Sequence, residues 1–281
     1  METTKTIVVT GSQSGMGYAS RLLLEKNGAK VIGVTNTDDA EVQADLSTSE
    51  GVDYAVQEII KLSGGNIDGV FANAGVDSSN AALVFGLNYF GIIRLLTALQ
   101  PYLKKSNNGR VVINASNSVV ITPGIPNDVV EALLEMDKEK AMNLIQKNPF
   151  WTYQASKTAI TKWARQNAFK SDWAGSNISM NLIAPGVVLT ALIEHDMKDP
   201  VKAKGINSLP KPNGDFAKAE NIAPLVKFLL LDDSRFIIGQ YIVIDGGVEV
   251  TWRGNESPKT WDISLDDYRA LSSTVSSEIK K

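Results

Sequence analysis

Short apolar runs rich in β-branched residues alternate with longer segments of helical periodicity along most of this chain. Such runs predict buried strands, because the strands of a parallel sheet are covered on both faces. Short connections join them to the helical segments, which is typical of crossover units, so the pattern predicts an α/β fold with a doubly wound parallel sheet of about seven strands. Strands are expected at residues 5–10, 30–34, 68–72, 111–115, 178–183 and 241–244, and long helices at 81–104, 151–173 and 222–231.

The alternation breaks at about residues 119–150, where a helical insertion interrupts it. Prolines and a glycine mark a loop at its start, and Asn127 is a candidate N-cap. Apolar positions then predict two short amphipathic helices, at residues 129–134 and 141–145. Three interpretations of this insertion stay open: a surface excursion, a wall over a substrate pocket, or a contact between subunits.

Two further segments lie outside the regular alternation. Residues 190–215 are rich in Lys, Asp, Pro and Gly, and they predict a substrate lid. Residues 248–281 form a C-terminal extension that follows a single domain at residues 1–247. A disordered tail would not normally carry large aromatic side chains, so we expect the extension to pack on the body or on a neighbouring subunit. Its aromatic residues are Trp252, Trp261 and Tyr268.

Composition narrows the function classes. With 281 residues, of which 43% are hydrophobic and 21% charged, the chain has the composition of a soluble globular protein. The net charge of −3 suggests neither a nucleic acid nor a membrane as a partner, and no apolar run approaches the roughly 20 residues that span a bilayer. The absence of cysteine excludes disulfides and thiol catalysis, and with His195 as the single histidine no metal site is predicted. The N-terminus runs directly into a strand, so we expect no signal peptide and a cytoplasmic location.

Three glycines follow the first strand and precede a helix, in the pattern Gly11-x-x-x-Gly15-x-Gly17. Glycines at such a turn let backbone N–H groups approach a pyrophosphate at the helix N-terminus. The arrangement predicts the first half of a Rossmann-type dinucleotide-binding unit. The alternative is a glycine-rich turn that binds nothing.

The end of the second strand is where this type of fold places the residue that contacts the adenosine ribose, an acid for NAD or a base for NADP. Thr35, Asn36 and Thr37 carry no charge there, and the carboxylates of Asp38 and Asp39 follow. These carboxylates would repel a 2′-phosphate, and no Arg or Lys is placed to hold one. The sequence therefore favours NAD(H) over NADP(H).

Tyr153 and Lys157 are spaced four residues apart in a predicted helix, so they share one face. A tyrosine in water has a pKa of about 10, and a neighbouring ammonium favours the phenolate, which makes such a pair a candidate for acid/base catalysis. The alternative, an ordinary amphipathic helix that holds both residues by chance, is open until other motifs are considered.

Together these motifs resemble those of the short-chain dehydrogenase/reductase family, across nearly all of residues 5–247. Each motif alone is weak, but the same seven in fixed order are specific. They are Thr10-Gly11-x-x-x-Gly15-x-Gly17, Asp45-Leu46, Asn73-Ala74-Gly75, Asn88-x-x-Gly91, Ser116, Tyr153-x-x-x-Lys157, and Pro185-Gly186 with Thr190.

The resemblance implies an NAD(P)-dependent oxidoreductase that interconverts a ketone and a secondary alcohol. Tyr153 would be the general acid in reduction and the base in oxidation, and Ser116 would hydrogen-bond the same substrate oxygen. Lys157 would bind the nicotinamide ribose and lower the pKa of Tyr153, and Asn88 would hold a water of a proton relay. A homodimer or homotetramer is also implied. The implied cofactor-binding residues are Gly11, Gln13, Ser14, Gly15, Met16, Gly17, Thr35, Asn36, Asp45, Leu46, Asn73, Ala74, Gly75, Tyr153, Lys157, Pro185, Gly186, Val188 and Thr190.

Two departures from the family pattern bear on the substrate. Ser118 is a rival for Ser116 as the substrate-binding serine, beside Tyr153. The gap of 37 residues from Ser116 to Tyr153 is longer than usual and resembles the bacterial 3α-hydroxysteroid dehydrogenase/carbonyl reductase branch, which implies a bulky apolar carbonyl or hydroxysteroid. Alternatives are a small non-steroid alcohol or ketone, a non-catalytic nicotinamide-binding regulatory protein, and an epimerase or dehydratase on a nucleotide sugar.

Overall fold

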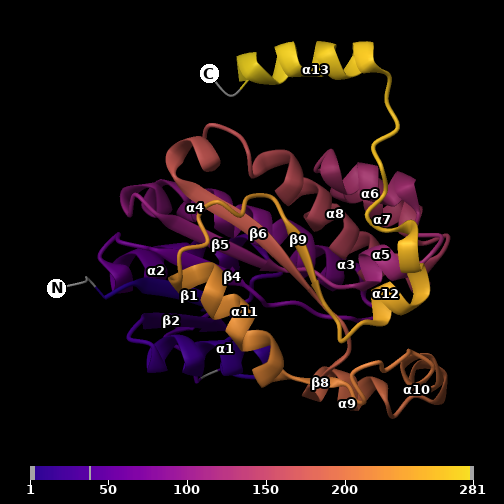
Figure 1. Ribbon diagram of the computed structural model, residues 1–281. Helices are drawn as coiled ribbons and strands as arrows, with labels where there is room; N and C mark the ends of the chain where they lie inside the picture. Colours follow the sequence, from indigo (N-terminus) through magenta and orange to yellow (C-terminus); the bar gives the residue numbers. More distant parts are fainter. Residues whose placement is uncertain (1–3, 38, 279–281) are drawn as a thin grey trace.

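The computed structural model describes residues 4–37 and 39–278 and contains one seven-stranded parallel sheet (Figure 1). The predicted Rossmann-type single domain is therefore confirmed. Strand boundaries differ from the predicted ones by one or two residues, and β3 was not predicted as a strand. In spatial order the strands are β3 (Val42–Gln43), β2 (Lys30–Thr35), β1 (Thr6–Thr10), β4 (Gly69–Ala72), β5 (Gly109–Asn114), β6 (Ile178–Pro185) and β9 (Tyr241–Ile244).

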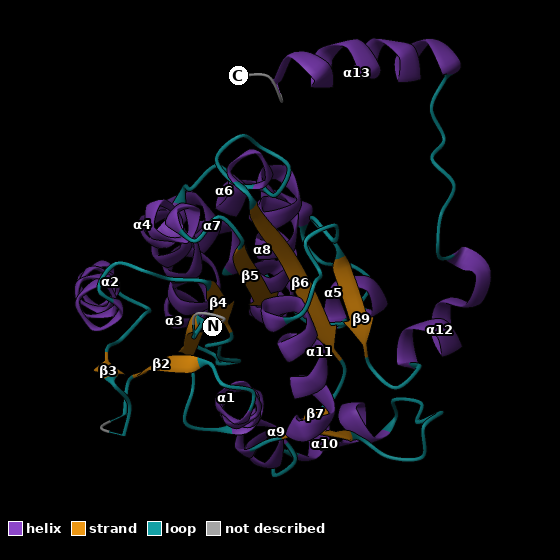
Figure 2. Cartoon of the chain, turned by 60° about the vertical axis from the view of Figure 1, so that its left-hand side comes forward, coloured by secondary structure: helices purple, strands orange, loops and turns teal. Residues whose placement is uncertain are grey.

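Helices cover both faces of this sheet, because its strands are apolar on both sides (Figures 1 and 2). One face carries α1 (Gly15–Lys26) and α11 (Ala219–Leu231), which pack against each other. The opposite face carries α2 (Ser49–Ser63), the segment that ends in α4 (Ile92–Lys105), and α8 (Thr152–Asn167). The chain order reverses between β1 and β4, and such a switch point opens a crevice at the carboxyl ends of the strands.

The segment predicted as one helix at residues 81–104 contains three helical elements. It starts as α3 (Ala81–Phe85), widens into the π-helical turn η1 (Gly86–Gly91), and continues as α4 to Lys105. By length and composition the stretch from Ala81 to Lys105 is apolar enough to cross a membrane, contrary to our expectation from the sequence. It is 61% buried over its most apolar window, as expected for a core helix packed on a sheet.

The insertion forms α5 (Ser118–Ile121), α6 (Asn127–Leu134), α7 (Lys138–Ile145) and the short turn η2 (Pro149–Trp151). Its two longer helices match the predicted pair, and α6 packs against both α7 and α8. The prediction of Asn127 as N-cap is wrong, because Pro126 occupies that position and its ring offers no side-chain acceptor. The apolar side of α6 and α7 joins the main core through Val129, Val130, Ala132, Leu133, Ala141 and Ile145. This packing makes the insertion part of the body rather than a detached surface excursion.

The segment after β6 also departs from a simple lid. A two-residue strand β7 (Val188–Leu189) pairs with β8 (Ala217–Lys218), and between them lie α9 (Ala191–Asp196) and α10 (Pro200–Asn207). The helix predicted to reach Trp173 ends as α8 at Asn167, and η3 (Ala174–Ser176) leads into β6.

The C-terminal extension forms α12 (Val248–Arg253), η4 (Gly254–Glu256) and α13 (Leu265–Glu278). In Figures 1 and 2, α13 stands away from the body at the end of an extended segment. Trp261 is 69% exposed and touches Tyr268 edge to face, so the predicted packing of the extension on the body is wrong for α13. Its packing on a neighbouring subunit stays a prediction.

Candidate active site

The glycine turn joins β1 to α1 at the switch point, and its backbone permits little but glycine. Gly11 and Gly15 adopt φ values of +64° and +50°, in the left-handed region that favours glycine. A Cβ on Gly17 would lie 2.0 Å from the Gly11 carbonyl oxygen, so the first turn of the helix passes directly against the loop. Ser14 is the N-cap of α1 but makes no side-chain cap bond, and Met16 packs on the α1–α11 side of the sheet.

Hydrogen bonds fasten this turn to the end of β4. The Thr10 hydroxyl accepts from the backbone N–H groups of Asn73 and Ala74, both at 2.9 Å. The Asn73 amide donates to the Thr10 and Gly11 carbonyl oxygens at 3.1 and 3.3 Å. The structure thus brings together the glycine turn and the Asn73–Gly75 motif, two cofactor-binding elements predicted from the sequence.

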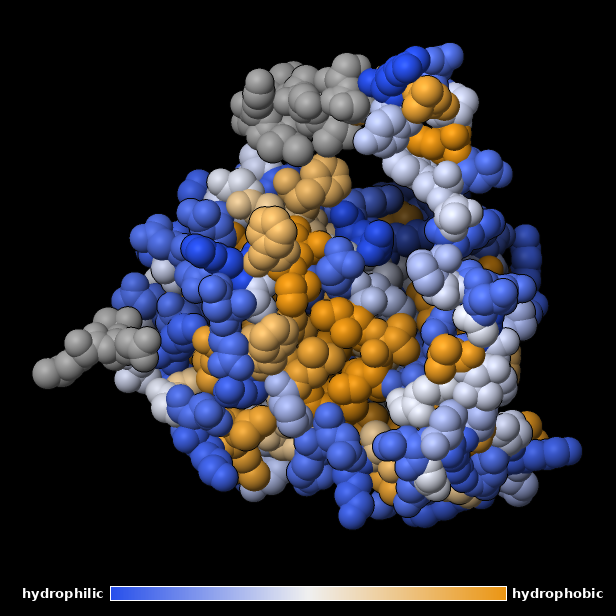
Figure 3. All heavy atoms as spheres, viewed as in Figure 1, coloured by the Kyte–Doolittle hydropathy of each residue, from blue (hydrophilic) through white to orange (hydrophobic). Residues whose placement is uncertain are grey.

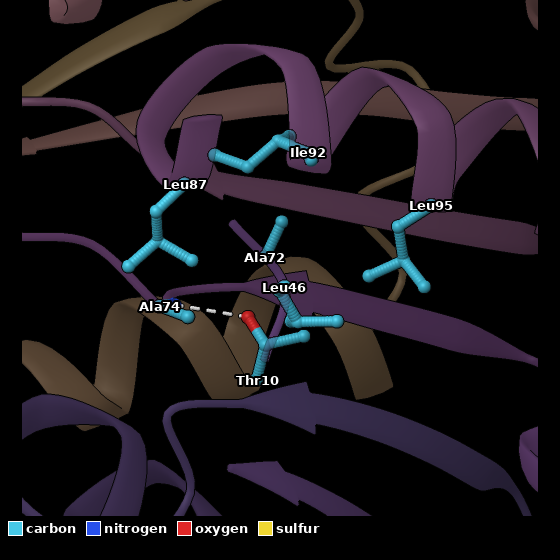
Figure 4. A pocket seen from close by; sticks show the side chains of 8 residues that line it. Thr10, Leu46, Ala72, Ala74, Leu87, Ile92 and Leu95 are labelled. Carbon is cyan, nitrogen blue, oxygen red and sulfur yellow. Dashed lines mark hydrogen bonds between the residues drawn. The ribbon is translucent and has the colours of Figure 1, made fainter. Parts of the chain in front are cut away.

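A small apolar cavity lies close to the switch point between β1 and β4. This cavity of about 10 Å³ lies between the ends of β1 and β4 and the start of α4, and Leu46 closes it (Figure 4). Asp45 uses its side-chain oxygen Oδ1 to accept from the backbone and hydroxyl of Ser47, which shapes the loop. The remaining lining residues are Thr10, Ala72, Ala74, Leu87, Gly91, Ile92 and Leu95.

The loop after β2 is held by contacts that sequence reasoning missed. The Gln13 amide donates to the Asp39 carbonyl oxygen, which ties this loop to the glycine turn. The hydroxyls of Thr35 and Thr37 lie 3.4 Å apart, and Asn36 between them is exposed. The other carboxylate named in the prediction, Asp38, lies outside the described residues.

Arg21, a cation on α1 that faces the loop after β2, is already paired. Arg21 on α1 forms an ion pair of 2.5 Å with Glu41 and one of 2.9 Å with Glu25. Glu41 also accepts from the Gly33 backbone N–H, and these contacts lower its pKa against the opposing effect of burial. A signal for this cluster was present in the sequence as a basic residue four before an acidic one on α1.

Asn88 sits inside the π-helical turn and is fully buried. Its side chain accepts from the Val76 N–H and donates to the Val76 carbonyl, both at 2.8 Å, and it also donates to the Ser156 hydroxyl at 3.2 Å. Single π-turns inside helices are rare and occur often at functional sites. Here the wider turn places an amide between the β4 loop and α8.

Tyr153 and Lys157 lie one turn apart near the start of α8, as predicted. The Lys157 ammonium is 5.8 Å from the centroid of the Tyr153 ring. Lys157 is 2% exposed and donates to the Asn114 carbonyl oxygen at 2.7 Å, which leaves two of its three N–H groups for other partners. A Cβ on Gly75 would lie 3.2 Å from Asn88 Oδ1 and 3.3 Å from Lys157 Nζ, so the absence of a side chain at Gly75 keeps this space open.

Burial dominates the titration of both residues. It raises the pKa of Tyr153 to about 12, against the lowering effect of the hydrogen bond with Ser116, while the carboxylates of Asp77 and Asp196 raise it further. It lowers the pKa of Lys157 to about 8. The Lys157 ammonium donates to the Asn114 carbonyl oxygen, and in the protein alone burial outweighs any lowering of the Tyr153 pKa, so the effect of Lys157 on this pKa stays a prediction.

The two candidate serines follow β5 and have different surroundings. The Ser116 hydroxyl accepts from the Ser118 backbone N–H at 3.2 Å and also bonds with Tyr153. The Ser118 hydroxyl is buried and has no hydrogen-bond partner among the described residues. Ser116 is therefore hydrogen-bonded to Tyr153, whereas the Ser118 hydroxyl is not.

A tyrosine that was not predicted from the sequence holds the backbone of Ser116 by a hydrogen bond. Tyr241, the first residue of β9, donates its hydroxyl to the Ser116 carbonyl oxygen at 2.5 Å. Next to it, the Asn117 amide donates to Asp245 at 3.1 Å, and Asp245 also accepts from two backbone N–H groups of its own turn. The sequence could not predict these contacts, because β9 and the end of β5 are far apart in the chain and come together only in the folded sheet.

The segment after β6 covers the glycine turn. A Cβ on Gly15 would lie 2.9 Å from the methyl group of Thr190, and a Cβ on Gly186 would lie 2.8 Å from the Cβ of Asp245. Val188 is buried in β7, and Pro185 ends β6. The predicted Pro185–Thr190 motif thus lies across the crevice from the glycine turn.

One ion-pair cluster connects the lid region to the β4 loop. Lys202 on α10 lies 2.7 Å from Asp196 on α9 and 3.6 Å from Asp77 after β4. The backbone of His195 falls within α9, and its side chain is not among those described. The cluster holds α9 and α10 close to Tyr153, whose pKa both carboxylates raise.

The residues fit a dinucleotide cofactor. The glycine turn leaves no side chain between α1 and the crevice, Gly75 leaves the space beside Asn88 and Lys157 open, and a buried ammonium has two free donors there. A helix N-terminus and such donors bind the phosphates and ribose hydroxyls of a nucleotide.

Comparisons with known proteins identify the family of the chain. Two family models match, "short chain dehydrogenase" over residues 5–124 and "Enoyl-(Acyl carrier protein) reductase" over residues 132–249. A 3-alpha-hydroxysteroid dehydrogenase/carbonyl reductase of Comamonas testosteroni is 31% identical, over 88% of this chain and 97% of its own length. Coniferyl-alcohol dehydrogenase of a Pseudomonas species is 31% identical, over 89% of this chain and 98% of its own length.

Among solved structures, the chain is similar to the 3-alpha-hydroxysteroid dehydrogenase of Pseudomonas sp. B-0831 in complex with NADH. The TM-score is 0.84 with 34% identity, over 92% of this chain and all of the other. Levodione reductase follows with a TM-score of 0.70 and 25% identity, over 88% of this chain and 98% of its own.

Proposed function

The chain belongs to the short-chain dehydrogenase/reductase family, whose members are NAD(P)-dependent enzymes acting on CH–OH groups, and on this premise we propose its reaction. The reaction is the reversible reduction of a ketone to a secondary alcohol, with Tyr153 as acid and base. The observation that carries the proposal is the convergence of Ser116, Tyr153 and Lys157 at the crevice beside the glycine turn.

The titration of Tyr153 suits a general acid. With its pKa raised to about 12, the phenol is neutral at physiological pH and holds a proton for the carbonyl oxygen of the substrate. Ser116, already bonded to the phenol, is positioned to donate to the same oxygen and stabilise its developing charge. When bound, the nicotinamide cofactor supplies or accepts the hydride. In oxidation the same groups act in reverse.

Lys157 and Asn88 complete the site. The two free N–H groups of Lys157 would hold the nicotinamide ribose hydroxyls, and its charge would favour the phenolate formed during turnover. Asn88 fixes the β4 loop against α8 and, with Lys157, borders the space at Gly75, where a relay water would bind. Burial of both side chains excludes bulk water from this side of Tyr153.

The substrate that fits best is a bulky apolar carbonyl or alcohol such as a hydroxysteroid. Two relatives over nearly the whole chain are named for 3-alpha-hydroxysteroid dehydrogenase activity. In addition, the insertion ends at η2, immediately before Tyr153, where Phe150 is 73% exposed and packs edge to face on Trp151. An exposed aromatic ring so close in the chain to Tyr153 suits an apolar ring system as substrate. A smaller aromatic alcohol is the second candidate, because one relative is a coniferyl-alcohol dehydrogenase.

NAD(H) is the cofactor that the residues after β2 favour. Arg21 on α1 is held by Glu25 and Glu41 and is not free for a 2′-phosphate. The structures similar to this chain include complexes with NADH and with NADP, so the preference rests on these residues alone.

A homo-oligomer is the assembly that the surface supports, and a cytoplasmic location stays a prediction. Figure 3 shows a broad apolar area over β9 and the neighbouring α11. The edge strand β9 is half-buried along its whole length, and Phe228 on α11 is 39% exposed. An apolar patch beside an unpaired sheet edge suits association with a second copy.

A substrate and cofactor screen tests this proposal. Purified protein is mixed with NADH or NADPH and a panel of 3-ketosteroids, aromatic carbonyls and small aliphatic ketones, and oxidation is followed at the nicotinamide absorbance. We expect turnover with NADH, fastest with a ketosteroid. Failure of both cofactors across the panel would contradict the reaction, and a clear preference for NADPH would contradict the interpretation of Thr35 to Asp39.

A further inference from the structure

A second cavity lies at the opposite edge of the sheet from the candidate active site. Its volume is about 590 Å³, and it opens between the starts of β5 and β6 and the loop before β9. Polar and aromatic side chains dominate its lining, chiefly Asn107, Asn108, Arg110, Asn177, Ser179 and Phe236.

Arg110 is the unusual member of this lining. It is 2% exposed and is the largest fully buried side chain in the described chain. Its Nη1 donates weakly to the Ser179 hydroxyl at 3.4 Å, while Nε and Nη2 have no hydrogen-bond partner among the described residues. Buried guanidinium groups are normally paired, because an uncompensated buried charge is strongly destabilising.

The charged groups around Arg110 do not satisfy it. Asp233 is the carboxylate that acts on it electrostatically, but this side chain is 80% exposed and lies 3.6 Å from Arg235. Arg235 itself lines the cavity and adds a second positive charge at the rim. Burial lowers the pKa of Arg110, which is the expected effect of removing a cation from water. The cavity thus combines a buried donor group with a cationic rim.

The opposite wall is apolar and open. Phe236 is 99% exposed, although a large aromatic side chain gains by burial, and Ile238 lines the cavity beside it. A ligand with an anionic end and an apolar body would match both walls at once. Arginine is suited to such a ligand because its planar fork binds carboxylate and phosphate oxygens in pairs.

We propose that this cavity binds a small organic oxyanion, a carboxylate or a phosphate monoester. Arg110 and Ser179 hold its charged end, with Arg235 at the rim, and Phe236 covers its apolar body. The site is distinct from the crevice, because Arg110 and Ser179 stand at the starts of β5 and β6, whereas Asn114 and Pro185 end those strands at the crevice. The proposal therefore does not depend on the proposed reaction.

Binding is tested on protein saturated with NADH, so that added anions cannot occupy the cofactor site. The probes are benzoate and phenyl phosphate, with benzamide as the neutral counterpart of benzoate, at constant ionic strength. We expect saturable binding of at least one anion by calorimetry, with a matching rise in Tm, and no response to benzamide. Absence of saturable binding by either anion overturns the proposal.

Variants then locate the site. We expect Arg110→Met to weaken binding of the anion at least about tenfold and Arg235→Gln to weaken it about threefold. Arg94→Gln, which removes the same charge on α4, should leave the affinity unchanged. Should Arg110→Met fail to fold by circular dichroism, the exposed positions Arg235→Gln and Phe236→Ser decide the question. Binding that is unchanged in both of these variants overturns the assignment.

Discussion

The two edges of one sheet each hold a buried cation, and the two cations have different surroundings. At the carboxyl edge, Lys157 is 2% exposed and donates to the backbone carbonyl of Asn114, among the residues of the candidate active site. At the amino edge, Arg110 is equally buried but has only a weak contact with Ser179. Both charges would be costly without a partner, so each marks a place where an anion or a polar ligand is expected.

The two sites differ in how the residues around Lys157 and around Arg110 are held in place. Around Lys157, side chains bond to backbone groups of distant strands, as Asn88 does to Val76 and Thr10 does to the Asn73 turn. Such bonds fix the positions of reacting groups before the substrate arrives, which is what catalysis requires. Around Arg110 the neighbouring amides and Phe236 are exposed, which suits reversible binding more than chemistry.

The largest expected effect comes from Tyr153→Phe, at the carboxyl edge. Loss of the phenolic proton should lower kcat by about 10³, or about 4 kcal/mol of transition-state stabilisation, because the Tyr153 phenol is the acid that shares a hydrogen bond with the Ser116 side chain. The Kd for NADH, measured by fluorescence, should stay within about twofold. Turnover close to that of the wild-type protein would exclude Tyr153 as the acid.

The next prediction sets the two buried cations against each other. Lys157→Met should lower kcat/KM about a hundredfold and weaken cofactor binding, because the ribose donors and the positive charge are lost together. Arg110→Met makes the same change at the amino edge and should leave kcat/KM within about twofold. Steady-state kinetics of the two variants, with circular dichroism as the folding control, provide the measurement. Equal losses in both variants would mean that the substitutions act through stability and not through the site.

The positions of the residues at the carboxyl edge could be predicted from the sequence, because these residues belong to local motifs. The glycine turn, Asn73–Gly75 and Tyr153 with Lys157 were placed correctly, since each depends on a strand end or a helical repeat. Six of the seven strands of the sheet were also expected from their apolar runs, whereas the two-residue β3 is too short to show a pattern.

Features that depend on contacts between distant segments could not be predicted in this way. Tyr241 reaches Ser116 across the sheet, and the π-turn around Asn88 inserts a wider turn into an ordinary apolar helix pattern. The raised pKa of Tyr153 could not be predicted, because the sequence shows the neighbouring lysine but not how deeply both groups are buried. Arg110 reads as an ordinary residue at a strand start until the structure shows its burial.

The smallest expected effect is a pH dependence that belongs to the carboxyl edge alone. Burial lowers the pKa of Lys157 to about 8, so this ammonium loses its charge as the pH rises through 8. We expect kcat/KM for carbonyl reduction to be flat near neutral pH and to fall about tenfold between about pH 7 and pH 9. Lys157→Met should lose this inflection, and Arg110→Met should keep it, because it leaves the lysine in place.

The same titration changes stability with the opposite sign, which gives a second measurement. The pKa of Lys157 falls from 10.5 to about 8 on folding, so between these values the unfolded chain binds more protons than the folded one. The free energy of unfolding should therefore rise with pH across this window, by about 3 kcal/mol at most. Urea unfolding of cofactor-free protein at both ends of the window, compared with Lys157→Met, isolates this contribution from other titrating groups. A difference between the two proteins that does not change with pH would mean that the lysine titrates outside the window, and the contrast between the two edges would then rest on Arg110 alone.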